Sequence, residues 1–433
     1  MIRLFTIFLF LISFFLNSLY AASDITYFVK SALKNNPKIN AERENLKSIK
    51  QNQNISKSEF LPSLTITGTQ SSIKTSEIID QSGSKSDDTK RNTDSKKISI
   101  DQKIFQGFQG INKFKKSKLE FEKAKNEYKQ IEQEIILDSV SAYYDLIFKS
   151  KNKEFNLANV NLLEQQVESD KLRLQKGEIS LTDLAQSESS LAGAQANFTK
   201  ADTEYVSAIA EFEKITRVNA PNDLTEPLQI TFDMPKSLKE ALISSNKNNP
   251  SLMIARINLA ISERELNVEK AKLSPSATLN YSKTENRDLS ATVDENEEET
   301  VQASISWPII QGGKNLSSIK KSKHKKEKSK LLLEDKENEI KTETATNWSF
   351  YQSAESVLIS TAAQLKAAEI ANEGISLEYD SGNTRTTLEL IQSRSLLLEA
   401  RISHAEAEKN LIVSKLKLLE QVGGLTTQAI KIP

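Results

Sequence analysis

The fold of this chain is decided by residues 111–176, INKFKKSKLEFEKAKNEYKQIEQEIILDSVSAYYDLIFKSKNKEFNLANVNLLEQQVESDKLRLQK, which contain no glycine and no proline. The apolar residues Ile136, Val140 and Tyr143 recur at steps of four and three, which places them along one side of a helix. At a rise of about 1.5 Å per residue this helix would extend roughly 100 Å. No compact domain can bury so long a helix, so its apolar stripe must face other helices lengthwise. Residues 314–373 have the same character and predict a second long helix.

The composition excludes several classes of function. The chain has no cysteine, which excludes disulfides, thiolate metal sites, cysteine nucleophiles and a lipid-modified N-terminal cysteine. Its 58 basic and 58 acidic residues cancel, which removes the electrostatic case for a nucleic-acid partner. Its 12 glycines and 9 prolines are too few for several globular domains and favour long amphipathic helices.

The first residues indicate the compartment. Residues 1–22 predict a secretory signal peptide, because Arg3 precedes a mainly apolar run at residues 4–16 and small residues follow at Ala21 and Ala22. The apolar run is shorter than the about 20 residues that a membrane-spanning helix needs; a retained anchor is the alternative. We therefore expect the mature chain to work outside the cytoplasm.

Short motifs recur in the same order in the two halves of the chain. They are KNNP at 34–37 and 247–250, QG at 106–107 and 311–312, and KKSK at 115–118 and 320–323. This recurrence predicts a tandem duplication, with one repeat at residues 23–223 and the other at residues 224–433, which ends in a short tail.

Each repeat predicts the same order of elements: a short amphipathic segment, a helix that ends at a proline, two strands, the long helix, a glycine turn and a returning helix. The strands are indicated by apolar residues at every second position, as in residues 98–104 and 301–307. Polar stretches at residues 74–97 and 283–300 predict exposed hairpin loops. A solvated loop explains the acidic run in the second stretch better than a cation-binding role.

Two hairpins supply four strands, which cannot close a barrel in a membrane. Three chains would supply twelve, an even number within the range of outer-membrane barrels. The sequence therefore predicts an α+β membrane channel: a trimeric 12-stranded β-barrel, continued by a long α-helical barrel.

Three motifs carry a resemblance to a known family. They are the strand-to-helix junction Trp307-Pro308-Ile309-Ile310-Gln311-Gly312-Gly313, the turn Thr384-Arg385-Thr386 near Gly382, and Gly177 followed by Leu181-Thr182-Asp183. In this order and duplication, the chain resembles the TolC family of outer-membrane efflux channel proteins. The resemblance implies a homotrimer in the outer membrane of a Gram-negative bacterium that extends into the periplasm. It also implies docking to a periplasmic adaptor (membrane fusion) protein and an inner-membrane pump, ABC or proton-driven, for multidrug or small-molecule efflux or for type I protein secretion.

The resemblance also implies a gate at the two tip turns, which contain Gly177 and Gly382. Arg385 is expected to pair with Thr182 and Asp183, and Tyr379 to hydrogen-bond toward Asp183, because charge-assisted bonds suit a modest, reversible closure. The alternative is that the polar residues of these turns only cap helix starts.

A tunnel constriction is implied one helical turn above the tip, at Glu389 and Gln392. The family usually has two aspartates there, so this chain departs from the pattern with a longer acid and a neutral amide. Three carboxylates in the trimer instead of six predict a weaker preference for cations.

Basic clusters begin both long helices, at residues 113–118 and 320–328. They predict a basic belt that faces anionic outer-membrane lipid. A solvated helix face is the alternative.

The sequence gives no indication of an enzyme, a cofactor or a metal site. His324 and His404 are isolated from other ligands, and neither a Gly-x-Ser-x-Gly motif nor a phosphate-binding glycine loop is present. Two alternatives to the channel remain at this point: a periplasmic coiled-coil adaptor or structural protein without a barrel, and a periplasmic enzyme on a helical scaffold.

Overall fold

The computed structural model describes residues 25–79, 81–221, 224, 232–290, 293–381 and 385–426. The predicted signal peptide and the turn residues Gly382 and Thr384 lie outside the described residues.

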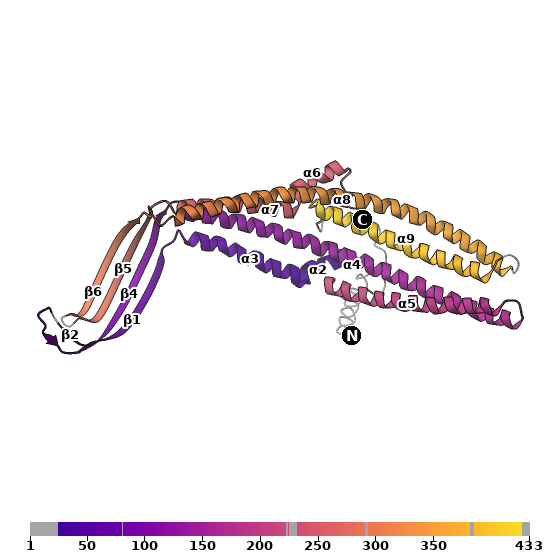
Figure 1. Cartoon of the computed structure of the whole chain (residues 1–433), viewed down its shortest axis with the longest axis horizontal. Helices are drawn as coiled ribbons and strands as arrows, with labels where there is room; N and C mark the ends of the chain where they lie inside the picture. The colour runs from indigo at the N-terminus through magenta and orange to yellow at the C-terminus, as the bar shows by residue number, and fades with distance from the viewer. Residues whose placement is uncertain are drawn as a thin grey trace, which may run out of the picture. The chain divides into compact units, whose positions relative to one another are not determined.

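The same order of elements occurs twice along the chain (Figure 1). The first copy consists of α2 (Ile25–Asn35), α3 (Pro37–Ser58), β1 (Ser63–Thr75), β4 (Thr89–Gln106), α4 (Gln109–Gln175) and α5 (Leu181–Thr216). The second copy consists of α6 (Leu238–Asn248), α7 (Pro250–Ala271), β5 (Ser276–Ser290), β6 (Val293–Ser306), α8 (Lys314–Asp380) and α9 (Thr387–Gln421). The two long helices, α4 and α8, have 67 residues each. The duplicated α+β fold predicted from the sequence is therefore confirmed.

Two compact units divide the chain. The helical unit comprises residues 1–43, 127–253 and 336–433, and the sheet unit comprises residues 44–126 and 254–335. Each unit contains parts of both copies. The boundary of the repeats between residues 223 and 224 stays a prediction.

The KNNP motifs explain how each copy turns from its short helix into the next. Pro37 and Pro250 occupy the first position of α3 and α7, where the missing N–H of proline costs no hydrogen bond. The asparagine before each proline bonds through its side chain to the end of another helix. The side-chain amide of Asn36 donates to the carbonyl oxygen of Ile215 at 3.0 Å, and that of Asn249 donates to the carbonyl oxygen of Gln421 at 2.9 Å. Each asparagine thus fastens its break to the end of the returning helix of its own copy.

The core of the helical unit lies where α2 packs against α4, α5 and α9. Phe28 stacks on Tyr143 with ring centroids 5.6 Å apart and meets Phe212 edge-on at 5.1 Å. Ile136 and Leu416, fully buried, belong to the same cluster. The apolar stripe that the sequence places on α4 is therefore covered by other helices along this part of its length.

The sheet unit contains one antiparallel sheet in the order β1-β4-β5-β6 (Figure 1). Leu64, Ile100, Tyr281 and Val301 lie directly opposite one another across its four strands and therefore share one face. The other face is polar; on it, the amide of Asn280 donates to the carboxylate of Asp101 at 2.7 Å. The predicted alternation of apolar and polar positions gives a sheet with one apolar and one polar face.

The predicted polar loops are shorter than the sequence indicated. Residues 283–290 and 293–300 are strand, and so are residues 89–97, so the prediction that these stretches are loops was wrong. Their charges pair across strands instead of requiring a loop: Lys283 forms an ion pair with Glu297, and Arg287 lies 3.4 Å from Glu295. Between β1 and β4 lies the short hairpin of β2 (Ile78–Ile79) and β3 (Lys85–Ser86).

None of the described helices is both long enough and apolar enough to span a membrane.

Candidate functional site: the tip turns of the helical unit

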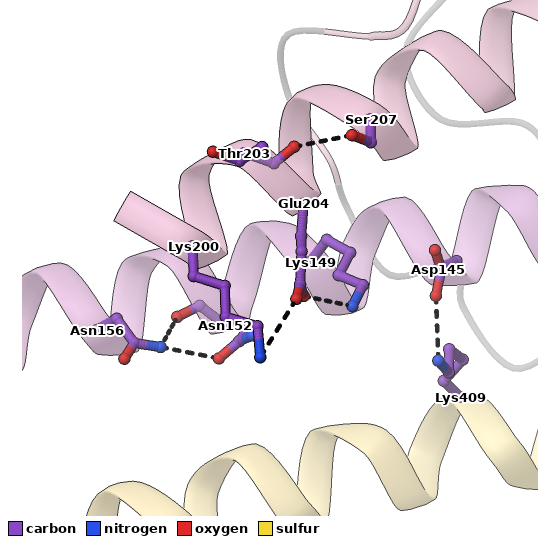
Figure 2. A network of polar contacts seen from close by, with 9 residues as sticks. All are labelled: Asp145, Lys149, Asn152, Asn156, Lys200, Thr203, Glu204, Ser207 and Lys409. Carbon is purple, nitrogen blue, oxygen red and sulfur yellow. Dashed lines mark hydrogen bonds and ion pairs between the residues drawn. The ribbon is translucent and has the colours of Figure 1, made fainter. Parts of the chain in front are cut away.

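Two antiparallel helix pairs form the candidate site. Figure 1 shows α5 returning along α4 and α9 returning along α8. Ion pairs hold α4 to its neighbours: Lys149 donates to Glu204 of α5 at 2.7 Å, and Lys409 of α9 donates to Asp145 at 3.0 Å (Figure 2). The hydrogen bond from Lys149 lowers the pKa of Glu204. These contacts fix the two hairpins against each other on the way to their turns.

The first tip turn is built by a glycine and a capping box. Gly177 has a φ of +74°, the left-handed conformation that favours glycine and that ends α4. Ser180 then caps α5, accepting a hydrogen bond from the backbone N–H of Asp183 at 3.2 Å. The carboxylate of Asp183 accepts in return from the backbone N–H of Ser180 at 2.9 Å and from its hydroxyl at 2.7 Å. These bonds lower the pKa of Asp183. Thr182 is exposed.

The second tip turn repeats this construction. Thr386 caps α9, and Glu389 accepts from its backbone N–H at 2.8 Å. Arg385 donates from Nε to Glu378 at 2.6 Å and from Nη1 to Glu389 at 3.1 Å. These ion pairs raise the pKa of Arg385, and the backbone bond from Thr386 is the main cause that lowers the pKa of Glu389. The guanidinium therefore joins the end of α8 to the start of α9.

A buried polar group lies within about three helical turns of the two tip turns. Asp170 is fully buried and accepts from the hydroxyl of Ser187 at 2.6 Å and from the amide of Gln166 at 3.0 Å. The hydroxyl of Tyr379, on α8, lies 3.3 Å from the same carboxylate and accepts from Gln166 at 2.9 Å. These residues join α4 and α5 of the first copy to α8 of the second.

Three further residues contact this group. Arg173 donates to the Tyr379 hydroxyl at 2.6 Å, and its guanidinium lies 5.1 Å from the centre of the Tyr379 ring. The hydroxyl of Thr387, at the start of α9, lies 3.3 Å from that of Tyr379. Arg394 donates to Gln166 at 3.4 Å, and burial lowers the pKa of its guanidinium. We call Gln166, Asp170, Arg173, Ser187, Tyr379 and Thr387 the tip network.

The predicted gate residues lie at the tip turns, but within one chain they have other partners than the resemblance implies. Tyr379 contacts Asp170 rather than Asp183, because its ring is directed into the helical unit and is buried. Arg385 is held by two carboxylates of its own turn, and the carboxylate of Asp183 is engaged by Ser180. The gate roles of Thr182, Asp183, Tyr379 and Arg385 stay a prediction.

The predicted constriction residues both lie in the first turns of α9. Glu389 is half-buried and serves the capping box, whereas Gln392 is exposed. Their role in a tunnel stays a prediction.

Sequence reasoning missed Gln166 and Asp170. A signal for them was present, because both follow Leu163 at helical steps of three and four and so fall on the buried side of α4. A carboxylate at such a position needs buried partners. Their identity was not accessible, because Tyr379 belongs to the other copy.

Within the described residues, no three His, Asp or Glu side chains gather as metal ligands would.

The family model "Outer membrane efflux protein" matches residues 28–216 and 242–424. Outer membrane efflux protein BepC of Brucella suis is 23% identical over 92% of this chain and 85% of its own length. Outer membrane protein TolC of Vibrio cholerae is 22% identical over 71% of this chain and 72% of its own. The solved structure of the CmeC outer membrane channel of Campylobacter jejuni has the same fold, with a TM-score of 0.81 at 15% identity over 92% of this chain and 85% of that chain.

The fold and the family match thus define an outer-membrane channel of the long-helix type. The chain belongs to the outer membrane efflux protein family. This family consists of channels rather than enzymes, and the chain is an export channel of the Gram-negative outer membrane. The resemblance predicted from the sequence is confirmed, and the comparisons support the channel over a coiled-coil adaptor without a barrel.

Proposed function

We propose that three copies of this chain close into a 12-stranded barrel in the outer membrane, and that their helices form a duct for export across the periplasm. The observation that carries this proposal is the four-stranded sheet. One of its faces is apolar and exposed, as at Leu64 and Val301, and its outer strands β1 and β6 each have one edge without a partner in the described chain. In lipid every backbone group must be bonded, so such edges have to pair with further strands.

The duct works with partners in this proposal. A periplasmic adaptor protein docks on the helical unit, and an inner-membrane pump, ABC or proton-driven, supplies cargo and energy. Both efflux and polypeptide secretion fit the comparisons, because the family is named for efflux and one similar protein is an alkaline protease secretion protein. The chain itself provides a passage and, we infer, catalyses no reaction.

The tip turns serve as the gate in this proposal. Closure is supported by the tip network, since Tyr379 joins hairpins from both copies. Opening would separate α8 and α9 from α4 and α5 and would exchange these bonds for water. The pair of Arg385 with Glu378 lies within the second hairpin and stays intact, so a docking partner has to supply only the free energy of separating the tip network.

Purification from outer membranes and recording in planar lipid bilayers tests the proposal. We expect trimers that resist detergent without heating and that conduct ions in discrete steps, with low conductance while the tip is closed. A monomer that stays in the aqueous fraction and gives no conductance would refute it.

A further inference from the structure

The apolar face of the sheet is confined to the half that adjoins the long helices. On β6 it runs from Val301 through Ile305, and exposed apolar residues continue to Ile310. In the opposite direction, the next positions on the same face after Tyr281 and Val301 are Lys283 and Glu299, which pair across the strands. The band covers residues 301–306 of β6, roughly 20 Å at about 3.3 Å per residue, and the exposed apolar residues that follow extend it toward the headgroups.

The position of this band places the helix starts at the periplasmic headgroups. The band ends beside the turns that lead into α4 and α8. These turns lie at the membrane surface if the sheet is inserted as proposed, and this inference rests on that insertion. Trp307, 61% exposed, lies at this boundary, as aromatic side chains do at membrane surfaces. Its indole N–H donates to the carbonyl oxygen of Leu273 at 3.0 Å, which fixes the ring at that level.

Both helices begin with positive charge and no negative charge. The first acidic residue of α4 is Glu120, and that of α8 is Glu327, after six lysines. Lys314 lies in the first turn of α8, where a cation opposes the helix macrodipole, so it does not serve helix stability. An ordinary solvated surface would mix both signs of charge. An anionic partner would offset both the opposition to the helix macrodipole and the excess of positive charge.

Some of these lysines already have partners in the sheet unit. Lys113 lies 2.6 Å from Glu59, Lys116 lies 2.8 Å from Glu265, and Lys326 lies 2.8 Å from Glu263. These pairs fasten α4 and α8 to the shorter helices, so this part of the predicted belt is neutralised inside the chain.

We define the lysine collar as five of the exposed lysines near the helix starts: Lys115, Lys314, Lys320, Lys321 and Lys323. Within the described part of the chain, none of them forms an ion pair or a side-chain hydrogen bond. Lys323 lies about 14 Å along α8 from Lys314, at 1.5 Å per residue. With the reach of a lysine side chain and a Debye length of about 8–10 Å, the whole collar is within range of a charged membrane surface.

We propose that the lysine collar binds anionic phospholipid headgroups of the periplasmic leaflet. The ammonium groups each offer three donors to phosphate oxygens, and their attraction adds to the insertion of the apolar band. The collar thereby fixes the depth at which the sheet sits in the outer membrane.

Lipid selectivity in nanodiscs tests the collar. Mature wild-type protein is placed in nanodiscs of phosphatidylethanolamine and phosphatidylglycerol, and spin-labelled forms of both lipids report which one occupies the protein surface. We expect wild type to prefer phosphatidylglycerol. The triple variant Lys320→Gln/Lys321→Gln/Lys323→Gln should lose this preference about threefold or more, and high salt should produce the same loss in wild type.

The matched control removes the same charge from exposed lysines farther along α8, in the variant Lys330→Gln/Lys341→Gln/Lys366→Gln. It should keep the wild-type preference. An unchanged preference in the collar variant, or an equal loss in the control, would overturn the proposal. So would a collar variant with fewer trimers and unchanged lipid preference, because the lysines would then pair with carboxylates of a second copy. Wild-type protein that does not stay in the nanodisc would refute the membrane insertion itself and the collar with it.

Discussion

The hydroxyl oxygen of Tyr379 lies 3.3 Å from the Oδ1 atom of Asp170, which joins α8 of the second copy to α4 of the first. Asp170 is fully buried, and the same carboxylate also holds Ser187 of α5. One carboxylate and one phenol therefore connect three of the four helices that meet at the tip turns. Any motion that separates the two hairpins has to break this group of bonds.

Removing the Tyr379 hydroxyl should favour the open channel. Tyr379→Phe keeps the ring but leaves Asp170, Gln166 and Arg173 without one buried partner, at a cost of about 1–3 kcal/mol for each chain. We expect a larger conductance or a higher open probability in planar bilayers. The control is Tyr351→Phe in the same helix, whose hydroxyl bonds to Glu355 at an exposed site and whose loss should leave the recordings unchanged. Wild-type recordings from Tyr379→Phe would contradict this role.

Replacing Asp170 should loosen the tip without affecting the sheet. In Asp170→Ala the hydroxyl of Ser187 and the amide of Gln166 lose a buried acceptor, at a cost of about 2–5 kcal/mol. Hydrogen exchange should accelerate in the last turns of α4 and the first turns of α5, and remain unchanged in the sheet. Asp202→Ala, which removes the surface ion pair with Lys153, should change exchange far less. Equal effects of both substitutions would show that the network has no special importance.

Acid should fray the start of α5 through Asp183. The pKa of this carboxyl lies below its ordinary value because Ser180 donates to it, so the folded cap binds its proton less readily than the unfolded chain does. The cap contribution is therefore complete above the ordinary pKa of about 4 and is lost as the pH falls through the lowered value. Exchange of the first amides of α5 should accelerate over that window in wild type. In Asp183→Asn the acceleration should be absent, and its persistence there would assign the acid sensitivity to another group.

Ion selectivity should follow the carboxylates at the start of α9. Glu389→Gln keeps a capping side chain at the third position of the helix and removes one charge for each chain. We expect reversal potentials that indicate a lower cation preference, whereas Gln392→Glu should raise it. If neither substitution shifts the reversal potential, these residues do not line the constriction.

The predictable part of the molecule is the part set by local sequence. Pro37 and Pro250 indicate their breaks because proline cannot continue the preceding helix, and Gly177 indicates its turn because the end of α4 adopts a left-handed conformation. The alternative interpretation of Asp183 as a capping residue describes its contacts within one chain correctly. Ser180 carries the matching half of that capping box.

Two features were beyond sequence reasoning for a physical reason. The charged residues 283–300 looked like a loop because their side chains are polar, but a strand exposed on both faces tolerates charge when partners lie opposite, as Arg287 and Glu295 do. The contact between Asp170 and Tyr379 depends on how two copies pack. The spacing of Asp170 places it on the buried side of α4, but it does not identify Tyr379 as its partner.

Cysteine cross-linking of the sheet edges tests trimeric closure most directly, because the chain has no cysteine of its own. Thr65 of β1 and Gln302 of β6 lie on the same polar face at opposite edges of the sheet, so a disulfide between them within one chain is too long to form. The control places the second cysteine on the interior strand β5, as Thr65→Cys/Ser282→Cys. Oxidation of outer membranes that contain Thr65→Cys/Gln302→Cys, with Ser304→Cys as the alternative register, should give covalent dimers and trimers, and the control should give none. Monomers alone from every β1–β6 pair would contradict a barrel closed by three chains.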